Sequence, residues 1–223
     1  MALIVAKFGG KSVGRPDHPH YPALAEKMGQ ELRKGHQVVV VPSAMDGETA
    51  RLIGIYRNRT GQNPTRDLDL YDALIATGEQ VSGAKFAQAL RDASYRANFL
   101  DPRDTVQTDG NHGMAAIKKI DAAAIRKELQ QNGVVVAGAF YGRGPKGKIT
   151  TGGRGASDTW AVEYGIAMKA DRVDIYTDTG GLYTADPKIV GADVVKKIDR
   201  LQHDLAFALA SAGGKFHPPA IKR

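Results

Sequence analysis

A glycine-rich stretch, residues 147–188, holds the densest group of side chains that could do chemistry. It carries a cation, Arg154, two hydroxyls, Thr151 and Ser157, and a carboxylate, Asp158. A helical pattern begins at about Ser157, and Ser157 or Asp158 can serve as its N-cap. Free backbone N–H groups at such a helix start, together with the helix dipole, favour an anion or a phosphate. Taken alone, the pattern also fits a glycine-rich connection without a function.

Two apolar segments nearer the start of the chain also end in residues that could contact a ligand. The β-rich run 3–8 carries Lys7 and leads into two glycines, and the β-branched run 37–41 is followed closely by Ser43. Open parallel sheets bind their ligands beyond the carboxyl ends of the strands. We therefore expect Lys7 and Ser43 near a ligand site. The alternatives are a solvated lysine at a strand edge and a serine that only caps a helix.

Length and composition narrow the class of protein. The 223 residues suit one sizeable α/β domain, or one domain with a small lobe. The chain has no cysteine, which excludes disulfides, thiolate nucleophiles and cysteine-based metal sites. The net charge of +7 is spread along the chain, which favours anionic small substrates over nucleic acid. We find no basic leader and no apolar run of membrane-spanning length, so we expect a cytoplasmic protein without a membrane partner.

The order of the apolar patterns predicts the fold class. Strand-like runs alternate with helical patterns and several end at glycines, which indicates a three-layer α/β/α sandwich with a mainly parallel sheet. The expected strands are 3–8, 37–41, 134–140 and 172–176, and the expected helices include 22–34, 67–77, 80–93 and 157–169. We expect a mobile insertion at 51–66 and a pair of short helical segments at 193–211. Residues 77–79 are expected to connect two helices, and the pattern alone favours Glu79 as a surface residue at a helix start.

Several segments, taken together, carry a resemblance to a known family. The segments are VAKFGGKSVG, SAMDGET, ATGEQVS, QTDGNHGMAAI, VVVAGAF, GGRGASDTWA, IYTDTGGLYTADPKIV and GGKFHPPA. In this order they resemble the aspartokinases of the amino-acid kinase family, with its opening strand, phosphate loop and signature segment. The resemblance covers nearly the whole chain. The co-occurrence of these motifs is far more specific than any single glycine-rich loop.

The resemblance implies an activity. Aspartokinases use ATP and Mg²⁺ to phosphorylate the side-chain carboxylate of L-aspartate, giving 4-phospho-L-aspartate, the first step of lysine, threonine and methionine biosynthesis. It implies one amino-acid kinase catalytic domain over residues 1–223, with a substrate-binding N-terminal half and a nucleotide-binding C-terminal half. It also implies a homodimer or larger homo-oligomer. The paired regulatory domains that follow the catalytic domain in aspartokinases are not expected within these residues. The alternatives are a sibling kinase acting on another acid, or an inactive nucleotide-binding subunit.

The resemblance also assigns roles to residues. As catalytic residues it implies Lys7, Arg154 and Asp158. As aspartate-binding residues it implies Ser43, Thr49, Glu79, Arg154, Ser157 and Asp158. As ATP-binding residues it implies Lys7, Gly9, Gly10, Ser12, Thr177, Asp178, Tyr183, Lys188 and Lys215. The fork of an arginine suits a bidentate carboxylate contact. No residue is assigned to a metal, because Mg²⁺ is expected to be held mostly by phosphate oxygens and water.

His112 lies in the QTDGNHG segment. Phosphoryl transfer to a carboxylate needs no general base, because the acceptor is already ionised near neutral pH. We therefore expect His112 to be a turn or hydrogen-bonding residue.

The chain departs from the family pattern at four positions. Lys11 stands where a threonine is usual, Lys188 where an arginine is usual, and Gly180 where an aspartate is usual. Ala156 stands where a glycine is usual, and its Cβ would cost about 1 kcal/mol or more if the backbone there had a positive φ. These departures bear on efficiency more than on the class of reaction.

Overall fold

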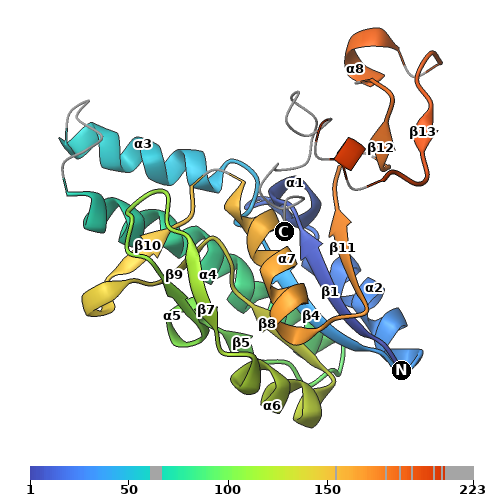
Figure 1. Cartoon of the computed structure of the whole chain (residues 1–223), viewed down its shortest axis with the longest axis horizontal. Helices are drawn as coiled ribbons and strands as arrows, with labels where there is room; N and C mark the ends of the chain where they lie inside the picture. Colours follow the sequence, from blue (N-terminus) through green and yellow to red (C-terminus); the bar gives the residue numbers. More distant parts are fainter. Residues whose placement is uncertain are drawn as a thin grey trace.

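The computed structural model describes residues 1–60, 67–153, 155–178, 180–185, 187–191, 193–202, 204–206 and 208. Its centre is a parallel sheet of five strands with helices on both faces (Figure 1). In spatial order the strands are β11 (Arg172–Tyr176), β1 (Leu3–Phe8), β4 (Gln37–Pro42), β8 (Val134–Ala137) and β5 (Phe99–Leu100). Runs of β-branched residues form β4 and β8, as expected for strands buried on both faces. The predicted three-layer α/β fold is confirmed.

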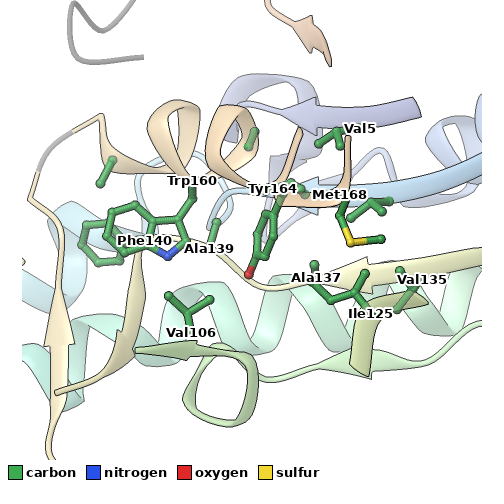
Figure 2. Packing of buried hydrophobic residues seen from close by; sticks show 14 of the residues in the cluster. Val5, Val106, Ile125, Val135, Ala137, Ala139, Phe140, Trp160, Tyr164 and Met168 are labelled. Carbon is green, nitrogen blue, oxygen red and sulfur yellow. The ribbon is translucent and has the colours of Figure 1, made fainter. Parts of the chain in front are cut away.

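One face of the sheet packs against α6 (Ala122–Asn132) and α7 (Ala156–Met168). Alternate strand residues, such as Val39, point into this layer because side chains along a strand alternate between faces. Figure 2 shows the aromatic side chains of α7 in this core. The buried Tyr164 hydroxyl donates a 2.7 Å hydrogen bond to the Gly138 carbonyl oxygen just after β8, which fixes α7 against the sheet.

The opposite face packs against α2 (Tyr21–Arg33) and α4 (Leu68–Asp92). Val40, one position along from Val39, points into this second layer. It shares a buried cluster there with Met28 of α2 and Phe86 of α4. The two clusters together make the sheet the central layer of the sandwich.

Smaller elements surround this sandwich. A mixed sheet has the order β10-β9-β6-β7, and an arm that contains β12 and β13 extends from the end of β11 away from the main sheet (Figure 1). The bounds are α1 (Gly10–Val13), β2 (Gly14–Arg15), β3 (His18–Pro19), α3 (Glu48–Thr60), α5 (Pro102–Thr105), β6 (Val106–Thr108), β7 (Ile117–Ile120), β9 (Tyr141–Arg143), η1 (Pro145–Gly147), β10 (Ile149–Thr151), β12 (Leu182–Tyr183), α8 (Pro187–Val190) and β13 (Lys197–Ile198). In the described part of the chain, no helix has the length and apolar character needed to cross a membrane.

The prediction of a mobile insertion at 51–66 is wrong for the residues that the structure describes. They belong to α3, which buries Leu52 and Tyr56 against the rest of the domain. These two residues are four positions apart and therefore lie on one face of the helix. The basic residues Arg51 and Arg57 of this helix are exposed. Residues 61–66 lie outside the described part of the chain.

The prediction of two helices separated at 77–79 is also wrong. Residues 68–92 form one helix, α4, which is 25 residues long. Gly78 does not interrupt it. A Cβ at this position would lie only 3.1 Å from the Cβ of Ala44. The glycine thus allows close packing, and Glu79 is placed in the interior of a helix instead of at a surface helix start.

The start of α7 differs from the prediction as well. Gly155, with φ of 82°, is the N-cap, in place of Ser157 or Asp158. Gly155 adopts the left-handed conformation, and Ala156 does not have a positive φ. The strain expected from the alanine at position 156 is therefore absent.

The segment 193–211 was predicted as two short helices. Its described residues contain β13, which pairs antiparallel with β12, and a helical turn at 204–206. Thr184 fixes this pairing, because its hydroxyl accepts a 3.0 Å hydrogen bond from the Lys196 amide. The prediction is thus wrong for β13, and residues 209–211 lie outside the described part.

Candidate active site

Two cavities open at the carboxyl ends of the central strands, and Gly10 lines both. The smaller one, of about 280 Å³, lies where β1 and β11 end. The larger one, of about 750 Å³, lies beside the end of β4. The residues implied for ATP that line the smaller cavity are Lys7, Gly9, Gly10, Ser12, Thr177 and Asp178. The residues implied for aspartate that line the larger cavity are Ser43, Thr49, Glu79 and Ser157.

An ion pair joins Lys7 to Asp158 in the smaller cavity. Lys7 is near the end of β1 and only 8% exposed, and Asp158 is in the first turn of α7. The Lys7 Nζ contacts the Asp158 Oδ1. Because both groups are largely withdrawn from water, their attraction is screened less than that of a surface pair. The carboxylate thus holds the ammonium in one place at the cavity wall.

The two glycines after β1 make close contacts with neighbouring strands and loops. The Gly9 N–H, expected to hold a phosphate, donates to the Tyr176 carbonyl oxygen at 3.3 Å and so continues the pairing of β1 with β11. The Ser12 hydroxyl donates to the same oxygen at 3.1 Å. A Cβ on Gly10 would lie 2.9 Å from the Ala44 carbonyl oxygen, so close packing requires glycine there. The Gly9 amide is therefore committed to the sheet.

Lys11 brings a second ammonium group to the smaller cavity. Its Nζ lies 3.2 Å from the Asp178 Oδ2, so the pair connects α1 to the loop after β11. The side chain of Lys11 is 59% exposed, and salt therefore screens this pair strongly. The lysine in place of the usual threonine thus meets one of the residues implied for nucleotide binding.

The larger cavity gathers hydroxyl groups from several elements. Ser43 follows β4 and Ser157 lies in α7, and their hydroxyls are 3.2 Å apart in a hydrogen bond. Thr49 lies in the first turn of α3. The Ser82 hydroxyl of α4 donates a 2.6 Å bond to the Ser43 carbonyl oxygen, and the Tyr21 hydroxyl donates a 3.0 Å bond to Ser82. This chain of bonds ties the turn after β4 to α2 and α4.

Glu79 places a carboxyl group in the wall of the larger cavity, and the residue is only 3% exposed. Its Oε1 accepts a 3.3 Å hydrogen bond from the Ala44 amide. The Oε2 is buried, and no described residue donates to it. Burial raises the pKa of Glu79 to about 8, while the Ala44 amide and the charge of Lys7 act in the opposite direction. A bound cation would stabilise the ionised carboxylate and so lower this pKa.

The larger cavity also contains residues that the sequence did not single out, among them Asp46, Arg57 and Tyr71. Arg57 is in α3 and brings a guanidinium group to the lining. The misassignment of its segment as an insertion concealed it. The apolar residues Leu52 and Tyr56, four positions apart, were the signal for a helix available in the sequence.

Among the remaining residues implied for the site, Tyr183 is the one whose side chain the structure describes. Tyr183, in β12, lines neither cavity. Arg154 and Lys215 lie outside the described residues, as does the side chain of Lys188. Among the described residues, no three histidine or acidic side chains gather as a metal site.

Each of the two cavities is lined by residues from both the N-terminal and the C-terminal part of the chain. Lys7 and Ser12, from the N-terminal part, line the smaller cavity implied for the nucleotide. Ser157, from the C-terminal part, lines the larger one. Parallel strands bring residues that are distant in sequence to one edge of the sheet, so the two cavities share both halves of the chain.

The family model described as the amino acid kinase family matches residues 2–222. The chain belongs to the amino acid kinase family. The aspartokinase of Geobacillus stearothermophilus is 38% identical over 224 residues, which are 100% of this chain and 53% of that protein. This chain therefore spans about half the length of the curated relatives it matches.

Solved structures agree with this family. The aspartate kinase from Synechocystis has a TM-score of 0.82 and is 34% identical, covering 99% of this chain and 35% of that chain. E. coli aspartokinase III in complex with aspartate and ADP has a TM-score of 0.80 and is 27% identical, covering 98% of this chain and 58% of that chain. The amino-acid kinase fold expected from the motifs is thus confirmed.

Proposed function

We propose that the protein transfers the γ-phosphoryl group of ATP to the side-chain carboxylate of L-aspartate, giving 4-phospho-L-aspartate and ADP. The observation that carries the proposal is the grouping of the implied residues into two adjoining cavities with a shared wall at Gly10. The resemblance to an aspartokinase bound to aspartate and ADP supports it. The reaction would be an entry step to lysine, threonine and methionine, in a cytoplasmic homodimer or larger homo-oligomer.

The smaller cavity suits the phosphates of the nucleotide. Lys7, held by Asp158, would stabilise the negative charge on the transferred phosphoryl group, which is where such reactions need electrostatic help. Lys11 would add a second cation near the phosphates. Mg²⁺ would be held mainly by phosphate oxygens and water, since Asp158 and Asp178 each already face a lysine.

The larger cavity suits an amino acid with a second carboxylate. Ionised Glu79 would pair with the α-ammonium group, and the hydroxyls of Ser43, Thr49 and Ser157 would donate to carboxylate oxygens. Arg154, by its resemblance to the family signature, would grip a carboxylate with two parallel hydrogen bonds.

The transfer itself needs no proton removal. An oxygen of the ionised side-chain carboxylate forms a bond to the γ-phosphorus, the bond from that phosphorus to the β,γ-bridging oxygen breaks, and ADP leaves with the electron pair. His112 is already engaged by Asp72 at 2.6 Å, in keeping with a structural use.

The acceptor is tested by ADP release from ATP with different acids. We expect release that depends on aspartate and saturates with it, and little release with glutamate or N-acetylglutamate. Release with N-acetylglutamate instead would indicate a sibling kinase. ATP binding without release for any of the three acids would indicate an inactive nucleotide-binding subunit.

A further inference from the structure

Asp72 is a buried carboxylate that the proposed chemistry does not use. It lies in α4 and is 0% exposed. Its Oδ2 accepts hydrogen bonds from the His112 Nδ1 at 2.6 Å and the Gly113 amide at 3.2 Å, and its Oδ1 accepts one from the Thr151 hydroxyl. A buried charge costs free energy unless it is paired and hydrogen-bonded, and these three donors meet that need. Asp72 thus joins α4, the turn at 111–113 and the end of β10.

The groups that Asp72 holds form one wall of the larger cavity. Gly113, Thr151 and Gly153 line that cavity, whereas none of them lines the smaller one. Asp72 itself is not in the lining. It therefore acts on this wall from behind and does not reach the cavity.

The two turns in this wall fit each other closely. Gly113 and Gly153 have positive φ values of 74° and 78°. A Cβ on Gly153 would lie 2.8 Å from the Gly113 carbonyl oxygen, and the Ala115 amide donates a 2.8 Å bond to the Thr151 carbonyl oxygen. A small shift of one turn must therefore move the other.

The helix α4 connects this wall to Glu79, the residue proposed to pair with the ammonium group of the acceptor. Asp72 and Glu79 are seven residues apart, which is close to two helical turns, so they lie on the same side of α4. In sequence, Gly153 leads directly into Arg154, the residue implied for the carboxylate. A single rigid helix thus carries the proposed ammonium partner and the carboxylate that fixes the chain before Arg154.

We propose that Asp72 is a positioning residue for the acceptor: through His112, Gly113 and Thr151 it holds the two glycine turns of the larger cavity in register. It thereby sets the affinity for the amino acid and not for the nucleotide. This inference rests on the proposed function for the identity of the acceptor. The role of Asp72 in the structure of the wall is independent of the proposed function.

The first test replaces the charge at constant shape. In Asp72→Asn the side chain keeps one acceptor oxygen and gains an N–H donor. It therefore cannot accept the hydrogen bonds of both Thr151 and His112. We expect the KM for the acceptor to rise by about tenfold or more, with the KM for ATP within about twofold. Equal rises in both constants would overturn the inference and indicate a general structural role.

A second pair of variants covers the case in which Asp72→Asn fails to fold. The His112 side chain is 25% exposed, so its truncation leaves a site that water can reach. We expect His112→Ala to raise the acceptor KM by about threefold or more, without changing the ATP KM. His112→Asn keeps an N–H close to the Nδ1 position and should restore most of the loss. An unchanged acceptor KM in His112→Ala, or no rescue by asparagine, would contradict the proposal.

Hydrogen exchange on the ligand-free protein separates this inference from the proposed function. The Gly113 and Ala115 amides should exchange about tenfold or more faster in His112→Ala than in the wild type, with the amides of β1 unchanged. If the wild type does not phosphorylate aspartate, the proposed function fails. Faster exchange at these two amides in His112→Ala would still support the role of Asp72 in ordering the two glycine turns of this wall. Unchanged exchange at both amides overturns the inference whatever the acceptor is.

Discussion

Replacing Lys7 with alanine should lower kcat by about 10²-fold or more, while the protein stays folded. Lys7 is the cation that β1 and Asp158 fix at the wall of the smaller cavity. Charge develops on the transferred phosphoryl group in the transition state, so a prepositioned ammonium acts there more than on bound ATP. Steady-state kinetics with saturating ATP and aspartate measures the effect.

Lys34→Ala is the matched control for Lys7→Ala. Lys34 is an exposed lysine at the end of α2, and its Nζ lies 2.7 Å from the Glu31 Oε1. It lines neither of the two cavities. This variant loses the same number of atoms and the same charge, and it should keep normal turnover. If Lys7→Ala also keeps nearly normal turnover, Lys7 has no part in stabilising the transferred group.

The second large effect is a pH dependence set by Glu79. Because burial raises the pKa of Glu79 to about 8, the free protein holds this group mostly protonated below that pH. Only the ionised form can pair with the α-ammonium group of the acceptor. We therefore expect kcat/KM for aspartate to fall about 50-fold between pH 8 and pH 6, with a slope that approaches tenfold for each pH unit. The ATP KM should show no such decline.

Glu79→Gln tests this assignment at nearly constant shape. The amide cannot ionise, so the decline below pH 8 should disappear and the aspartate KM at pH 8.5 should rise about tenfold or more. A variant that keeps the same decline would mean that another group titrates.

The stability of the ligand-free protein provides a readout of Glu79 that needs no substrate. The pKa is higher in the folded protein than its ordinary value of 4.5. The folded state thus binds more protons in this range, and the free energy of unfolding should fall as the pH rises from about 4.5 through 8. Glu79→Gln should lose this part of the decline in stability. Chemical denaturation at several pH values measures it.

The sequence predicts the parts of this fold that local patterns determine. Val38 to Val41 and Val134 to Val136 are continuous β-branched runs, and they form central strands as expected. The run 172–176 becomes β11 with the expected bounds. The layers follow from these strands, because a parallel sheet must be covered on both faces.

Features that depend on contacts between distant segments could not be predicted in this way. The Gly9 amide donates its hydrogen bond to the distant Tyr176, and Glu79 is buried beside the turn at Ala44, whose amide donates to it. Local propensity also misread Gly78, whose place in α4 is favoured by packing against that same turn. The pairing of Asp72 with Thr151 joins residues 79 positions apart, and no spacing in the sequence indicates it.

The most direct test of the account is to trap the product with hydroxylamine. An acyl phosphate on the side chain of aspartate reacts with hydroxylamine to give the β-hydroxamate. With ATP, Mg²⁺ and aspartate, we expect this hydroxamate to accumulate in step with ADP, and we expect none with glutamate or N-acetylglutamate. ADP release without any hydroxamate, or equal hydroxamate formation with the other acids, would contradict transfer to the aspartate side chain.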